Sequence, residues 1–187
     1  VGTIASNATG AVSYQDANAL TVGTVGAQTG IASGGGNVTL LTAAGAGGNL
    51  TVTQPLNAGG GTVSLTVGDT ATQGASGNIT AGSLLLSGAG TFTFLNLGND
   101  VGTIASNATG AISYQDANAL IVGTVGAQTG IASGGGNVTL LTAAGAGGNL
   151  TVTQPLNAGA GTVSLTVGDT ATQGASGNIT AGSLLLS

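Results

Sequence analysis

The stretch GNLTVTQPLNAG at residues 48–59 returns without change at residues 148–159. It belongs to a longer duplication, because residues 101–187 match residues 1–87 except at three positions. The exceptions are Val12 against Ile112, Thr21 against Ile121, and Gly60 against Ala160. Self-similarity at a fixed period is typical of repeat architectures. We therefore predict a first unit at residues 1–100 and a second, incomplete unit of the same solenoid at residues 101–187.

The limits of the chain also bear on its organisation. It begins at Val1 without methionine and ends at Ser187, the counterpart of Ser87. The segment GAGTFTFLNLGND, residues 88–100, therefore occurs once and has no second copy. We expect the chain to be a segment of a longer array.

Glycine separates short runs in which apolar and polar residues alternate. Such alternation is typical of β-strands with one buried face, and no stretch reads as a helix of ten or more residues. The strands predicted in the first unit are VGTIAS (1–6), AVSYQ (11–15), LTVGTV (20–25), GIAS (30–33), NVTLLT (37–42), NLTVTQ (49–54), TVSLTV (62–67), NITA (78–81), SLLLS (83–87) and TFTFLN (91–96).

Many short strands fit either a row of sandwich domains or a solenoid. Sandwich domains would be joined by linkers of different composition, but GNDVGTIAS crosses the unit boundary at residues 98–106 with the same composition as its surroundings. A solenoid needs no linker, because each coil stacks on the one before. We predict an all-β, right-handed parallel β-helix with about 4–5 coils per 100-residue unit.

Alternation also predicts which side chains fill the core. The predicted inward residues are Val38, Leu40, Leu50, Val52, Val63, Leu65, Val67, Ile79, Leu84, Leu86, Phe92 and Phe94. Their neighbours Thr39, Thr51, Ser64, Thr66 and Thr93 are expected to point outward. At the corners, Asn and Gly are expected to adopt left-handed conformations.

The amino-acid composition excludes most catalytic mechanisms, because the residue types that they need are missing. The chain has no Lys, Arg, His or Cys, and its only acids are five Asp, giving a net charge of −5. General acid and base catalysis usually needs His, Glu, Lys, Cys or paired Asp, so we expect no enzyme, no catalytic residues, no metal site and no cofactor. Without basic residues, nucleic acids and anionic membrane surfaces are not expected partners. No apolar run is long enough for a membrane-spanning helix.

The motifs NDVGTIAS, NALTVGTVG, GGNVTLLTA, GNLTVTQPLNAGGGTVSLT and GNITAGSLLLSG resemble the repeat region of filamentous-haemagglutinin-type exoproteins of Gram-negative bacteria. The resemblance covers essentially the whole chain. It implies a β-helix, export through an outer-membrane secretion partner, and display at the cell surface.

The leading hypothesis is a structural rod of a secreted or cell-surface filament or adhesin stalk. A solenoid leaves unpaired strand edges at its ends, so the rod is expected to self-associate end to end. The alternative is a surface-binding solenoid whose outward threonines contact ice or carbohydrate. TVT at 51–53 and TFT at 91–93 suggest this alternative, although the two Thr pairs do not recur at one coil spacing.

The motif Asn-x-Thr is a potential glycosylation acceptor in an exported protein. It occurs at Asn7, Asn37, Asn49, Asn78, Asn107, Asn137, Asn149 and Asn178. We treat these eight positions as candidate modification sites.

Overall fold

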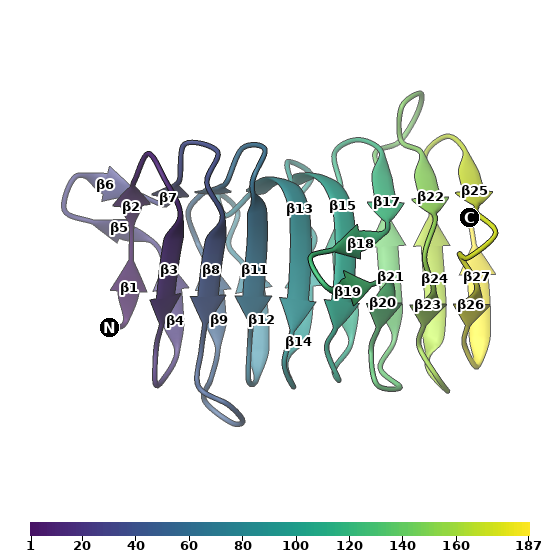
Figure 1. Ribbon diagram of the computed structural model, residues 1–187, viewed down its shortest axis with the longest axis horizontal. Coiled ribbons are helices and arrows are strands. Elements are labelled where there is room, and N and C mark those ends of the chain that lie inside the picture. The colour runs from purple at the N-terminus through teal and green to yellow at the C-terminus, as the bar shows by residue number, and fades with distance from the viewer.

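The computed structural model describes residues 1–187 and contains strands and turns but no helix. Its two long sheets are parallel throughout. The chain winds through about eight coils of about 23 residues each. Figure 1 shows these coils side by side along a horizontal axis, with the N-terminus at the left and the C-terminus at the right. The predicted all-β parallel β-helix is confirmed.

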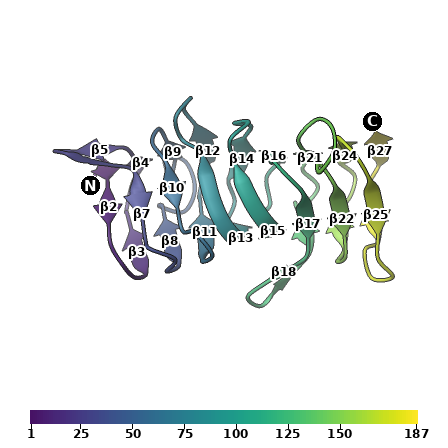
Figure 2. The same cartoon turned by 90° about the horizontal axis from the view of Figure 1, so that it is seen from above.

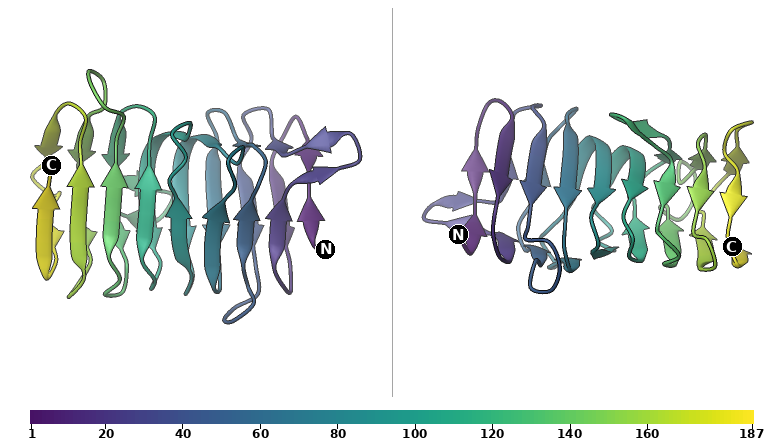
Figure 3. Two further views of the ribbon diagram at one scale, coloured as in Figure 1. Left: turned by 180° about the vertical axis from the view of Figure 1, so that it is seen from behind. Right: turned by 60° about the horizontal axis from the view of Figure 1, so that its bottom comes forward.

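One face of the rod is a nine-stranded sheet, seen from behind in the left panel of Figure 3. In spatial order its strands are β1 (Thr3–Ile4), β4 (Leu20–Val22), β9 (Leu50–Val52), β12 (Thr70–Gln73), β14 (Thr91–Phe94), β16 (Ile112–Gln115), β21 (Val138–Leu141), β24 (Thr162–Thr166) and β27 (Ser183–Leu186).

A fourteen-stranded sheet covers the rest. Its main row is β3 (Val12–Gln15), β8 (Val38–Leu41), β11 (Thr62–Thr66), β13 (Ile79–Ser87), β15 (Asp100–Asn107), β17 (Leu120–Val122), β22 (Leu150–Val152) and β25 (Ala171–Gln173). A row of short strands leads to the start of β13, in the order β2 (Ser6–Asn7), β7 (Ile31–Ala32) and β10 (Leu56–Asn57), and β10 pairs with β13 itself. Others continue from the end of β15, namely β20 (Ile131–Ala132), β23 (Leu156–Asn157) and β26 (Ile179–Thr180).

The core is one aliphatic column that runs through both units. It contains 35 buried hydrophobic residues in a single cluster, and every predicted inward residue is among them. Thr39, Thr51, Ser64 and Thr66 are partly exposed and Thr93 is exposed, as predicted. The substitution of Val12 by Ile112 keeps an aliphatic side chain against this core.

Residues one hundred positions apart lie on opposite faces of the rod. The strand β9 belongs to the nine-stranded sheet, whereas its copy β22 belongs to the fourteen-stranded sheet. The reverse holds for β8 and its copy β21. A unit must therefore contain a half-integer number of coils, and at about 23 residues per coil this number is four and a half. Consecutive units are related by a half-turn about the rod axis.

Some strand boundaries differ from the predictions. LTVGTV was predicted as one strand, but β4 ends at Val22 and the chain then leaves the sheet. NITA and SLLLS join into the single strand β13. The strand β12 (Thr70–Gln73) was not predicted, because its inward residue is the small Ala71, which conceals the apolar alternation. Ala71 lies in register with the large Phe92 of the next coil.

The expectation that Asn adopts left-handed conformations at corners is wrong. All residues with positive φ are glycines, among them Gly34 and Gly59. Asn side chains instead connect neighbouring coils: Asn37 Oδ1 accepts from the backbone N–H of Thr62 at 2.9 Å, and Asn49 Oδ1 from that of Thr70 at 3.1 Å. These bonds satisfy donors at the start of each strand.

Each unit also carries an antiparallel hairpin outside the coils. The first is β5 (Thr24–Val25) with β6 (Gln28–Thr29), and the second is β18 (Thr124–Val125) with β19 (Gln128–Thr129). Because β5 follows the nine-stranded sheet and β18 follows the fourteen-stranded sheet, the hairpins leave opposite sides of the rod, as Figure 2 shows.

The second hairpin packs over the outer face of the preceding unit. Its strand β18 lies against β13 and β15, where outward Leu85 and Ala105 are in register. Val125 is 4% exposed there, whereas the equivalent Val25 is 51% exposed. The hairpin therefore joins two units from the outside.

Val125→Ala should lower the free energy of unfolding by about 1–2 kcal/mol, because it removes two buried carbons. The identical change at Val25 should alter it by no more than about 0.5 kcal/mol, because that side chain is largely in water. Urea unfolding of both variants measures the difference. Equal effects would contradict the packing of the second hairpin.

Candidate functional site

Hydroxyl side chains form a continuous outward column on the nine-stranded sheet. Each member is the register partner of the next in the neighbouring coil. The hydroxyl column is Thr3, Thr21, Thr51, Thr72, Thr93, Ser113, Thr139 and Ser164. Parallel strands lie about 4.8 Å apart, so the hydroxyl groups are evenly spaced along the rod.

Part of this column widens into a polar array. Thr70 and Thr72 of β12 lie in register with Thr91 and Thr93 of β14. On the other side, Thr70 Oγ1 donates to Asn49 Oδ1 at 2.6 Å. We call Asn49, Thr51, Thr70, Thr72, Thr91 and Thr93 the hydroxyl array. The two Thr pairs noted in the sequence are not in register with each other, because Thr51 is in line with Thr72 and Thr93 and not with Thr91. The pair that matches Thr91 and Thr93 comes from the unpredicted strand β12.

The half-turn between units repeats four of these six positions on the opposite face. Asn149, Thr151, Thr170 and Thr172 line a shallow depression on the fourteen-stranded sheet. Thr172 Oγ1 donates to Thr151 Oγ1 at 3.2 Å. The residues of both copies are uncharged and offer hydrogen-bonding groups, and beside the second copy the Asp169 carboxylate accepts from Thr170 Oγ1 at 3.3 Å.

The most buried acid is held by a small polar network. The Asp116 carboxylate accepts from the Tyr114 hydroxyl and from the backbone N–H groups of Val101 and Asn118, each at 2.9 Å. Asp116 and Tyr114 are fully buried. Burial raises the pKa of Asp116 above its usual value of 3.8, although the hydrogen bonds act in the opposite direction. Burial also raises the pKa of Tyr114. This network anchors a corner of the coil.

The equivalent Asp16 has a different partner. The N-terminal ammonium of Val1 donates to its carboxylate at 2.7 Å, and the Tyr14 hydroxyl donates at 3.1 Å. The ammonium hydrogen bond lowers the pKa of Asp16.

The raised pKa of Asp116 predicts a pH dependence of stability. A raised native pKa gives stability that is present below the unfolded value of 3.8 and lost as pH rises through the native value. We expect the stability of the chain relative to Asp116→Asn to fall from about pH 3 to about pH 7. Urea unfolding across this range measures it, and a relative stability that rises with pH would contradict the prediction.

The remaining acids do not assemble into a site. Asp69 accepts from the backbone N–H of Gly47, and its copy Asp169 from that of Gly147. No group of three or more acids or other metal-ligating residues comes together.

The candidate glycosylation positions divide by their structural role. Asn7, Asn107 and Asn178 are exposed, as are Asn37 and Asn137, whose side chains also accept bonds from the next coil. Asn49, Asn78 and Asn149 are partly buried. Modification at these positions stays a prediction.

No family model, curated protein or solved structure matches the chain. No helix is present that is long and apolar enough to cross a membrane.

Proposed function

We propose that the chain is a structural, non-catalytic β-solenoid rod, part of a secreted or cell-surface bacterial filament or adhesin stalk. The observation that supports this most directly is the junction between units. The strand β15 begins at Asp100 and continues through Asn107, and it pairs with β13 in one unbroken register. The core is likewise continuous across the boundary. Adding a unit therefore lengthens the rod without a new kind of interface.

The chemistry of the surface is consistent with an inert spacer. The chain has five acids and no bases among 187 residues, so it lacks the Lys and Arg that trypsin-like proteases cleave. Buried polar side chains are all hydrogen-bonded, which agrees with a rigid and specific coil. The resemblance to haemagglutinin-type repeats adds an exported location and a secretion partner to the proposal.

Arrays of one, two and three added units would test the rod. Each unit should lengthen the particle by about 22 Å, which is four and a half coils at about 4.8 Å. Cryo-electron microscopy measures this length directly, and globules joined by flexible links would contradict the proposal. Immunogold labelling of intact producing cells tests the location, and label confined to the cell interior would contradict surface display.

A second candidate function is binding to an uncharged surface such as ice or carbohydrate. The register of Thr70 and Thr72 with Thr91 and Thr93 favours it. Thermal hysteresis and pull-down with insoluble polysaccharides test this function. Since the array is duplicated, the informative variant changes both copies, Thr72→Glu with Thr172→Glu. The control changes both hairpins, Thr24→Glu with Thr124→Glu, where the side chains are exposed. Equal activity of the two variants would exclude the array.

A further inference from the structure

The hydroxyl array is a flat grid and not a single row. Each of three successive coils contributes two outward side chains that lie two residues apart. Two residues of a strand span about 6.6 Å and neighbouring strands lie about 4.8 Å apart, so the grid is regular in both directions. The left panel of Figure 3 shows the strands of this sheet running side by side in nearly the same direction, whereas strands of ordinary sheets rotate by about 20–25° from one to the next. The rows of the grid therefore stay aligned over several coils.

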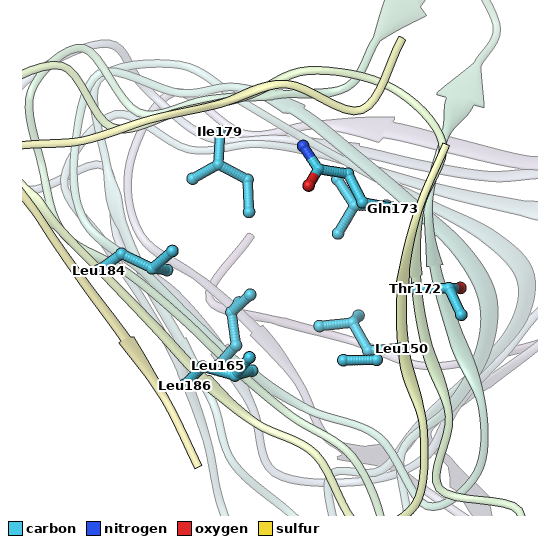
Figure 4. Close-up of a pocket in the computed structure, with 9 residues that line it drawn as sticks. Leu150, Leu165, Thr172, Gln173, Ile179, Leu184 and Leu186 are labelled. Carbon is cyan, nitrogen blue, oxygen red and sulfur yellow. The ribbon is translucent and has the colours of Figure 1, made fainter. Parts of the chain in front are cut away.

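The grid faces solvent and its side chains carry no charge. All four threonines of β12 and β14 are exposed. In the second copy, Figure 4 shows Thr172 of β25 pointing away from the core side chains Leu150 and Ile179. The carboxylate of Asp69, which precedes β12, accepts from the backbone N–H of Gly47. A ligand of this face therefore meets hydroxyl, methyl and amide groups.

The threonine side chains of the grid are restricted in orientation. Threonine is branched at Cβ, so it has few rotamers within a strand. At the side of the grid, Asn49 Oδ1 accepts from Thr70 Oγ1 at 2.6 Å and from the backbone N–H of Thr70 at 3.1 Å. A hydroxyl can donate once and accept twice, so this bond leaves the acceptor positions of Thr70 free for water. The array thus presents hydrogen-bonding groups in a fixed pattern.

The shape and composition of the grid favour a lattice of water over a carbohydrate. Sites for small organic ligands are usually concave and lined by apolar and aromatic side chains. The grid is flat, and Phe92, Phe94 and Tyr114 are buried in the core, so these rings cannot stack on a sugar. An ice surface is itself a flat periodic lattice, and each of its water molecules donates and accepts hydrogen bonds. Regular spacing is therefore the property that the ligand and the array share.

We propose that the hydroxyl array binds ice. This inference rests on the second candidate function and names its ligand. The threonine hydroxyls bond to water molecules of the ice surface, and the methyl groups between them release mobile water as they pack against the lattice. A single hydrogen bond of this kind contributes little net free energy, but a rigid array makes all of its bonds together.

Partition of the whole chain into slowly growing ice tests this inference, with thermal hysteresis measured on the same samples. We expect the chain to be enriched in the ice fraction and to show hysteresis. A chain that stays in the liquid and shows no hysteresis would overturn the inference. Binding to an insoluble polysaccharide without partition into ice would also overturn it, and would leave the array as a carbohydrate-binding surface.

Paired variants locate the contact, and both copies are changed because either face can meet ice. Thr72→Val with Thr172→Val removes two hydroxyls and keeps the shape, whereas Thr72→Ser with Thr172→Ser keeps the hydroxyls and removes the methyl groups. Both pairs should reduce partition into ice, because the grid needs both groups, whereas a carbohydrate site held by hydrogen bonds would tolerate serine. The control, Thr24→Val with Thr124→Val on the exposed hairpins, should partition like the unchanged chain. Circular dichroism checks that each variant is folded, and full partition of both array variants would contradict binding through the array.

Electron microscopy of the same samples separates this inference from the proposed rod. Rods of the expected length that do not enter ice would contradict the ice site and leave the structural role intact. Particles that enter ice but are not rods would support the ice site and contradict the structural role.

Discussion

Leu84→Ala is expected to lower the free energy of unfolding by about 2–5 kcal/mol, the range found when a buried leucine leaves a cavity. Leu84 has no exposed surface and lies between Val63 and Ile104 of the neighbouring coils. Parallel coils are close-packed on both sides, so the surrounding strands have little freedom to collapse into the gap. Urea unfolding followed by circular dichroism measures the loss.

The control for this prediction is built into the sequence. Leu184 has the same sequence neighbours as Leu84 but is 54% exposed in the last coil of the 187-residue chain. Leu184→Ala should therefore change stability by less than about 1 kcal/mol. Comparable losses at both positions in the 187-residue chain would contradict the explanation that burial between two coils causes the loss at Leu84.

Asn99→Ala should cost about 3 kcal/mol or more, because one buried side chain serves several partners at the unit junction. Its Oδ1 accepts from the backbone N–H of Ile79 at 2.9 Å and from Gln73 Nε2 at 2.7 Å. Its Nδ2 donates to the backbone oxygens of Phe94 at 3.3 Å and Gln115 at 3.1 Å. Alanine would leave buried polar groups of three coils without partners.

Asn118→Ala provides the comparison. Asn118 is exposed, and only its backbone N–H is bonded, to Asp116. Its replacement should change the free energy of unfolding by about 0.5 kcal/mol or less. If Asn99→Ala were equally mild, the junction would be held by apolar packing alone.

The architecture was predictable because its main signal is local. Alternation marks which side chains face inward, and the hundred-residue period identifies a repeat before any contact is known. The substitution of Gly60 by Ala160 is compatible with this repeat, because neither residue has a positive φ. The network around Asn99 was not predictable, because Asn99 bonds to Gln73, 26 positions earlier in the chain, and no short motif relates the two.

The candidate site was predictable only in part. Thr51 and Thr93 stood out as outward residues, but the array depends on β12, whose inward Ala71 gives a weak alternation. The two-sided arrangement depends on coil length. Adjacent coils differ in length, so the half-coil by which each unit exceeds four coils appears only when the strands are paired in space.

That half-coil determines on which sides of a long array the copies of each surface feature lie. A unit with a whole number of coils would place every copy of a hairpin or hydroxyl array on the same side of the rod. Four and a half coils per unit instead place alternate copies on opposite sides, so that each side repeats after two units, or about 43 Å. A rod lying on a flat surface therefore turns every second unit toward the surface and the other units away from it. If the hydroxyl array binds a surface as proposed, one rod can contact two surfaces at once, one along each side.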